Sequence, residues 1–238
     1  MVYSKPALGD YEKEYFIELA SAFINNKNVQ PKQKVDWNRL MQLSQTHSLI
    51  GLVGYMAQYD KSDFAPDEQT KEELLYGYMG TLKAYANYSY EHKLVIDELN
   101  KNKIPHILMK GYVIQNYYPL NEIRTMGDLD LTVHDRDIEK TDKILCAMGY
   151  KYNKTSGCAR EYYKKLIQIE IHTNLISSSY KIINDELINY FKDCWNYAYE
   201  AGNGFSFELE AEYHLLFLLA HIAKHFRSNG CGIRMILD

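Results

Sequence analysis

The chain has 238 residues, of which 46% are hydrophobic and 24% are charged, and its formal net charge is −4. These values are ordinary for a globular protein, and the length is enough for one large domain or two small ones. The slight acidity, without any block of Lys and Arg, argues against long nucleic acid as a general partner.

Three further features bear on location. The longest apolar runs, residues 49–57 and 215–223, are far shorter than the roughly 20 residues that span a bilayer. The N-terminus carries no apolar segment of the secretory type. The four cysteines are widely spaced and match no zinc pattern: Cys146, Cys158, Cys194 and Cys231. We therefore expect a cytoplasmic protein with reduced thiols and no membrane association.

The first hundred residues have helical spacing. Residues 11–24 form one apolar stripe, and Asp36 is placed to cap a helix that runs to His47. Residues 67–100 continue the helical period over a much longer segment with an acidic first turn.

The pattern changes at Lys103. Residues 104–111 predict a short buried strand that ends in the turn Lys110-Gly111, followed by a short helix before Pro119. Residues 126–135 alternate as a strand does, and an amphipathic helix follows them. Further strands are predicted at residues 150–154, 161–164 and 165–175.

Helices return after Ser177. We predict them at residues 184–195 and 207–228, the second being the most apolar in the chain. The apolar run at residues 233–237 resembles the first turns of a helix that is not completed, and we expect the natural protein to continue beyond Asp238. The predicted fold is α+β, with a small mixed sheet in residues 103–176 between helical regions at residues 1–102 and 177–238.

Two aspartates stand one residue apart in the strand "DLDLTV". Asp128 and Asp130 share one strand face, where each carboxylate disfavours ionisation of the other. A solvated sheet face would explain such a pair without any function. The neighbouring residues favour a site instead, because Glu170 lies on another alternating strand and Lys110 and Arg124 supply cations. Three clustered carboxylates form a hard-oxygen site suited to Mg²⁺.

Other metal-dependent classes also use paired aspartates. The string "DLDLT" matches the haloacid-dehalogenase phosphatases, but there the first Asp ends an apolar strand, and here the polar run "EIRTMG" precedes Asp128. Metal-dependent glycosyltransferases need a large N-terminal sheet, and residues 1–100 are predicted to be helical. The spacing excludes an EF-hand loop.

The combination of segments resembles a known family. Residues from Ile104 onward resemble the DNA polymerase β-like nucleotidyltransferase superfamily, above all its bacterial group of uncharacterised nucleotidyltransferases. The resemblance is carried by "LMKGYVIQNYYP", "RTMGDLDLTV", "IEIH" and the later "H…H…GIRMILD". The superfamily usually has Gly-Gly or Gly-Ser after its first strand, whereas this chain has Lys110-Gly111, a form that the closest group shares.

The resemblance implies a function and a set of roles. The expected reaction transfers NMP from an NTP to a hydroxyl of a small-molecule or protein acceptor and releases pyrophosphate. Asp128, Asp130 and Glu170 are expected to bind two Mg²⁺ ions, for which Mn²⁺ can substitute, and Glu170 is alternatively the base for the acceptor. Gly111 would let the backbone approach the phosphates.

Further residues have two interpretations each. Lys110 and Arg124 are either phosphate contacts or ordinary surface cations, and His172 either touches the substrate or is structural. His221 and His225 lie with His214 on one helical stripe, where they either line the cleft or belong to the core. The alternative function is a nucleotide- or partner-binding module of the same fold without turnover, which the missing Gly-Ser motif favours.

Overall fold

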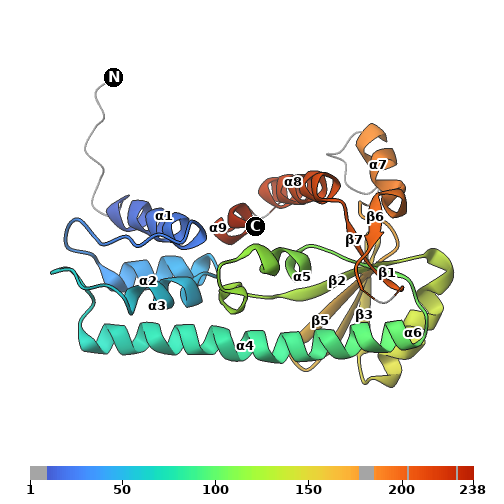
Figure 1. The fold of residues 1–238 in the computed structure, drawn as a ribbon, viewed down its shortest axis with the longest axis horizontal. Helices are drawn as coiled ribbons and strands as arrows, with labels where there is room; N and C mark the ends of the chain where they lie inside the picture. Colours follow the sequence, from blue (N-terminus) through green and yellow to red (C-terminus); the bar gives the residue numbers. More distant parts are fainter. Residues whose placement is uncertain (1–9, 177–184, 203, 229) are drawn as a thin grey trace. The chain divides into compact units, whose positions relative to one another are not determined.

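The computed structural model describes residues 10–176, 185–202, 204–228 and 230–238 (Figure 1). The described residues form two compact units. The first contains those of residues 1–86, 116–125 and 232–238, and the second those of residues 87–115 and 126–231. Within the described part of the chain, no helix is both long and apolar enough to cross a membrane.

The first unit is helical, as the sequence predicts for most of it. Its elements are α1 (Asp10–Ile24), α2 (Trp37–Thr46), α3 (Ile50–Ala57), the first part of α4 (Glu68–Lys101), the 3-10 turn η2 (Asn121–Ile123) and α9 (Ile233–Leu237). The predicted cap of α2 is confirmed, because the Asp36 carboxylate accepts a hydrogen bond from Arg39 N–H at 3.0 Å. Fully buried Phe16, Leu40 and Leu52 form part of its core.

The second unit is built on a mixed sheet, which has seven strands in the described part of the chain. The strands are β1 (His106–Leu108), β2 (Asp128–Val133), β3 (Lys151–Ser156), β4 (Ala159–Lys164), β5 (Ile167–His172), β6 (Ala198–Glu200) and β7 (Ser206–Leu209). Their order is β3-β4-β5-β2-β1-β7-β6. The pairs β2–β5 and β1–β7 are parallel, and the other neighbours are antiparallel. The predicted α+β class is therefore confirmed.

Helices cover both faces of this sheet. They are α5 (Gly111–Ile114), α6 (Ile138–Ala147), α7 (Asp185–Lys192) and α8 (Ala211–Ser228), with 3-10 turns at Gln115–Tyr117, Asp135–Asp137 and Cys194–Tyr197. One core joins the end of α4 and α6 to Leu129, Leu131 and Val133 of β2. The other core joins α7 and α8 to Ile107 and the adjoining Met109.

One predicted helix is wrong at its start. The sequence favours a helix over residues 207–228, but Ser206–Leu209 is strand β7 and α8 begins only at Ala211. Parallel pairing with β1 holds this segment extended, together with the hydrogen bond from His106 N–H to Phe205 O at 2.9 Å. Phe207 and Leu209 have the i,i+2 spacing of a strand, but this short segment directly precedes a long apolar helix, and the tertiary pairing decides where the helix begins.

The helix expected at residues 184–195 also differs. Its first residue, Asn184, lies outside the described residues. Helix α7 ends at Lys192, and Cys194–Tyr197 continues as a 3-10 turn that leads into β6. The sheet thus extends beyond residue 176, where we expected it to end. The division of the chain into domains at residues 102 and 176 stays a prediction.

Candidate active site

The two central strands place two of the three predicted acidic residues, Asp130 and Glu170, side by side. In the parallel pair β2–β5, Asp130 is opposite Glu170, and Thr132 is opposite His172. The strand alternation sends the leucines of β2 into the core formed with α4 and α6. Asp130 and Asp128 therefore belong to the other face of the sheet, which α7 and α8 cover.

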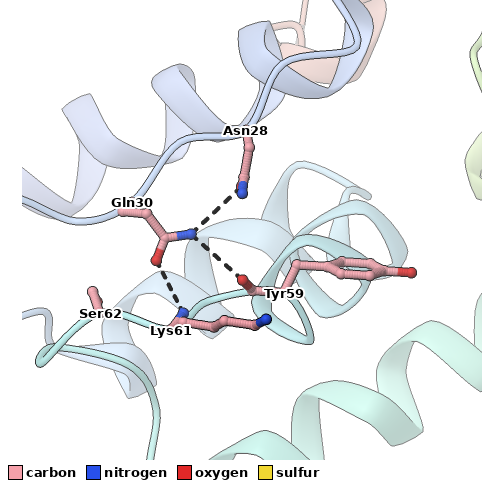
Figure 2. Close-up of a pocket in the computed structure, with 5 residues that line it drawn as sticks. All are labelled: Asn28, Gln30, Tyr59, Lys61 and Ser62. Atoms are coloured by element: carbon pink, nitrogen blue, oxygen red, sulfur yellow. Dashed lines mark hydrogen bonds between the residues drawn. The ribbon is translucent and has the colours of Figure 1, made fainter.

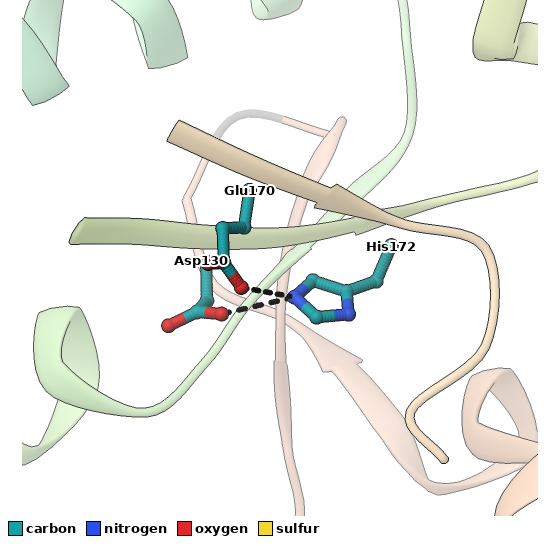
Figure 3. A group of neighbouring side chains, drawn as sticks. All are labelled: Asp130, Glu170 and His172. Atoms are coloured by element: carbon teal, nitrogen blue, oxygen red, sulfur yellow. Dashed lines mark hydrogen bonds and ion pairs between the residues drawn. The ribbon is translucent and has the colours of Figure 1, made fainter. Parts of the chain in front are cut away.

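Three side chains converge at this point, as Figure 3 shows. His172 Nε2 lies 2.9 Å from Asp130 Oδ1 and 3.5 Å from Glu170 Oε2. One ligand atom of each residue lies within 4.8 Å of the others. Asp130 and His172 are buried, whereas Glu170 is half-buried. The predicted pair Asp130–Glu170 is thus brought together, and His172 joins it directly.

The turn after β1 brings a lysine to the same carboxylate. Lys110 Nζ lies 2.5 Å from Asp130 Oδ1, and the lysine side chain is only 13% exposed. The Lys110 backbone has φ 50° and ψ −128°, a conformation that L-residues rarely adopt and that costs about 1–3 kcal/mol. Gly111 is the first residue of α5, and the left-handed φ falls on Lys110 before it. A close approach of the Gly111 backbone to phosphates stays a prediction.

The charges of the site stabilise one another. Burial favours the neutral form of Asp130, but the attraction of Lys110 and the hydrogen bond from His172 outweigh it and lower the pKa of this carboxyl. The hydrogen bond with His172 also lowers the pKa of Glu170. Burial opposes the charge of His172, yet its bonds to Asp130, Cys158 and Glu170 raise the pKa of its ring. Two protein cations therefore neutralise the carboxylates at neutral pH.

Helix α8 covers the turn with a stripe of rings. The Lys110 N–H donates to His214 Nε2 at 3.0 Å, and the Phe217 ring centre lies 6.0 Å from Lys110 Nζ. His221 and His225 follow on the helix, with ring centres 4.5 Å apart. Burial, and next the charge of Lys110, lower the pKa of His221. Contact of His221 and His225 with a nucleotide stays a prediction.

Arg124 has a different environment. It lies in the first unit, where its Nε and Nη2 donate to the two carboxylate oxygens of Asp238 at 3.0 and 2.7 Å. Tyr118 Oη donates to the same carboxylate at 2.8 Å, and Arg124 is buried. A phosphate contact of Arg124 stays a prediction, and it would require this guanidinium to exchange partners.

Sequence reasoning missed two contributors. Gln168 Nε2 donates to Glu170 Oε1 at 2.9 Å, and Cys158 Sγ lies 4.0 Å from His172 Nδ1. Gln168 has the strand parity of Glu170 and His172, so the alternation of this strand held the signal for it. Cys158 precedes β4 and comes close only through the pairing of β4 with β5, which no local pattern reveals.

A separate cavity of about 450 Å³ lies in the first unit (Figure 2). It is lined by Asn28, Gln30, Tyr59, Lys61 and Ser62. The Gln30 amide forms hydrogen bonds with other lining residues: its Nε2 donates to Tyr59 O at 3.5 Å, and its Oε1 accepts from Lys61 N–H at 3.0 Å. The lining contains no carboxylate, so it is not a candidate catalytic site.

The donor set on β2 and β5 fits a divalent cation. Asp130 and Glu170 offer carboxylate oxygens, which Mg²⁺ and Mn²⁺ prefer. His172 would add a ring nitrogen only after losing a proton, because its surroundings favour the charged ring. Because Lys110 and His172 already bind the Asp130 carboxylate, an ion at this oxygen must displace at least one of these contacts.

Carboxylates on adjacent strands of a mixed sheet, beside a turn that presents a lysine, form the arrangement that the resemblance implies for a nucleotidyltransferase. Comparison with protein families gives the same result: the model of the family "uncharacterised nucleotidyltransferase" matches residues 33–238. The chain belongs to this family.

The other comparisons are with solved structures and with curated proteins. A crystal structure of a candidate nucleotidyltransferase from Thermotoga maritima matches with a TM-score of 0.41 and 15% sequence identity. This match covers 60% of the present chain and 91% of the Thermotoga chain. Among curated proteins, no significant match was found.

Proposed function

We propose that this nucleotidyltransferase is a divalent-metal-dependent enzyme that transfers NMP from an NTP to a hydroxyl of a small-molecule or protein acceptor. The observation that carries the proposal is the convergence of Asp130, Glu170 and His172 within 4.8 Å, with Lys110 bound to the same aspartate. A carboxylate cluster that only stabilised the fold would not need the half-buried Glu170 beside the buried residues Asp130 and His172.

The carboxylates of Asp128, Asp130 and Glu170 would hold two Mg²⁺ ions. When bound, the ions neutralise the triphosphate and lower the pKa of the acceptor hydroxyl. In the transfer, the acceptor oxygen forms a bond to the α-phosphorus while the bond from this phosphorus to the bridging oxygen of the β-phosphate breaks. Pyrophosphate leaves, and the hydroxyl proton passes to Glu170 or to solvent.

Lys110 has a role that follows from its position. Its ammonium group is held at the carboxylates and is available to a phosphate oxygen once an ion has taken its place on Asp130. Gly111, directly after it, allows the backbone to approach the phosphates. Most of the rate enhancement would come from positioning and from charge neutralisation.

The alternatives predict different chemistry. A phosphatase of the Asp-x-Asp-x-Thr type needs its first Asp at the end of a strand, but Asp128 is the first residue of β2. A binding module without turnover is still supported by one observation, namely that Lys110-Gly111 stands where the superfamily usually has Gly-Ser. It differs from the enzyme in a measurable way, because it binds an NTP without releasing pyrophosphate.

The test is an assay of the purified chain with each radiolabelled NTP, Mg²⁺ or Mn²⁺, and a panel of hydroxyl-bearing acceptors that includes the protein itself. We expect pyrophosphate release and a labelled acceptor, and their loss in the double variant D128N/D130N. The matched control is D97N, in the exposed pair Lys93–Asp97. Full activity in the double variant would overturn the proposed site, and tight NTP binding without pyrophosphate release would favour the binding module.

A further inference from the structure

One hydrogen bond ties helix α8 to the turn that follows β1. The Lys110 N–H donates to His214 Nε2 at 3.0 Å, between residues 104 positions apart in the sequence. His214 is buried, and its backbone N–H donates to Glu210 O at 2.8 Å at the start of α8. The bond from Lys110 N–H to His214 Nε2 is part neither of the hydrogen bonds between strands nor of those within a helix.

The bond acts on a backbone that is under strain. Lys110 holds a φ of 50° while Lys110 O accepts hydrogen bonds from Val113 and Ile114 N–H at 3.1 and 2.9 Å. The carbonyl side of the residue is therefore anchored by α5, and the amide side by His214. Without an acceptor for its N–H, the backbone is free to relax toward negative φ, which would swing the side chain away from Asp130.

The imidazole must be in a particular state to accept this bond. An acceptor Nε2 requires a neutral ring with its proton on Nδ1. The surroundings favour the neutral ring, because burial and then the charge of Lys110 lower the pKa of His214 to about 4. This is the opposite of His172, whose surroundings favour the charged ring.

We propose that His214 is a positioning residue whose Nε2 lone pair holds the Lys110 turn in the conformation that sets Lys110 Nζ on Asp130. Its consequence for catalysis rests on the proposed function: the turn then also determines where the nucleotide phosphates meet the carboxylates. His214 itself is not expected to touch the reacting atoms.

The first test uses the unaltered protein. In a ¹⁵N-labelled sample, the imidazole nitrogens of His214 are assigned by NMR between pH 6 and 8. We expect the proton on Nδ1 and an unprotonated Nε2 throughout this range. A ring with its proton on Nε2 would overturn the proposal, because such a nitrogen cannot accept the Lys110 N–H.

The second test follows hydrogen exchange of the Lys110 amide in three variants. H214L removes the acceptor and keeps an apolar side chain, whereas H214Q keeps an acceptor oxygen at similar reach. Y213F is the matched control, since it removes a hydrogen bond of the neighbouring buried residue, from Tyr213 Oη to Tyr190 O, away from the turn.

We expect exchange at Lys110 to be roughly tenfold faster in H214L, close to wild type in H214Q, and unchanged in Y213F. If H214L fails to fold, the tautomer of the wild-type ring still decides, because a proton on Nε2 would overturn the proposal. Wild-type exchange at Lys110 in folded H214L would overturn the proposal.

Kinetics separate this inference from the proposed function. We expect H214L to raise the KM for NTP roughly tenfold, with recovery in H214Q and no effect in Y213F. A wild-type KM in H214L would overturn the catalytic consequence. A wild-type protein without any transfer activity, but with the expected exchange pattern, would reject the proposed function and support the positioning role.

Discussion

Lys110 Nζ lies 2.5 Å from Asp130 Oδ1, at the centre of the predicted metal site. The sequence raises the question of why two like charges share one strand face, and a bound Mg²⁺ is the answer it suggests. The structure supplies another answer, because Lys110 and His172 both bind the same carboxylate oxygen. The acidic face is thus compensated by the chain itself, and an ion would compete with these contacts.

The first prediction concerns this ion pair. In K110M with EDTA present, we expect the free energy of unfolding to fall by about 3 kcal/mol, since the variant leaves the buried Asp130 carboxylate short of a cation. Urea unfolding followed by circular dichroism measures the change. Added Mn²⁺ is expected to raise the Tm of K110M more than that of the wild type, because the ion no longer competes with the lysine.

The control for this experiment is K93M, in the exposed pair Lys93–Asp97, whose side chains are 71% and 55% exposed. We expect its free energy of unfolding to change by no more than about 0.5 kcal/mol. Equal stability of K110M and wild type in EDTA would show that the buried pair does not form in solution.

The second prediction concerns the contribution of Glu170 to transfer activity, compared with that of an acidic residue outside the site. In E170Q, we expect the transfer rate to fall by about 10²-fold or more, because one carboxylate of the proposed metal site is neutralised. The half-buried position of Glu170 predicts a much smaller effect on stability. The control is E208Q on β7, whose carboxylate accepts from Tyr199 Oη at 3.2 Å. Transfer by E170Q at the wild-type rate would remove Glu170 from the site.

The third prediction concerns His92 in α4. This ring is fully buried, and neither nitrogen has a hydrogen-bond partner among the described residues. The rings of Tyr88 and Tyr112 lie near it, at centre distances of 5.6 and 6.2 Å. In H92L, we expect the free energy of unfolding at pH 8 to rise by about 1 kcal/mol, since an unsatisfied polar ring is replaced by an apolar side chain.

The same residue predicts a pH dependence. Burial lowers the pKa of His92 from 6.5 to about 4, although the charges of Asp130 and Glu91 oppose the shift. Between these values the unfolded chain binds more protons than the folded one, so stability is lost as pH falls from about 6.5 to 4. Over this pH window, the free energy of unfolding of H92L should fall less than that of the wild type, and the difference between them should grow by at most about 1.4 kcal/mol per pH unit. Parallel pH–stability curves for H92L and wild type would contradict this.

The fourth prediction tests the role of Arg124. In R124Q, we expect the free energy of unfolding to fall by about 3 kcal/mol, because the largely enclosed Asp238 carboxylate loses the guanidinium that donates to both of its oxygens. The control is R136Q, whose arginine side chain is 76% exposed. A loss of NTP affinity with unchanged stability would instead support the phosphate contact that the sequence suggests for Arg124.

Local patterns were enough for most of the elements. The helical period predicts α1 and α4, and Asp36 marks the start of α2, because periodicity and capping act within a few residues of the chain. Alternation predicts β2 and β5, with their polar residues on one face. The same kind of signal fails at Ser206–Leu209, where pairing with the distant strand β1 decides between helix and strand.

For the site, local sequence patterns predict which residue types are present and which of them share a strand face: Asp128 with Asp130, and Glu170 with His172. The family resemblance added their chemistry. Three contacts come from the folding of distant segments onto one another: Lys110 and His172 meet on one oxygen of Asp130, Arg124 binds Asp238, and His214 holds the turn. The reason is that such contacts join residues far apart in the chain, and their charges and hydrogen bonds act over a few ångströms of space.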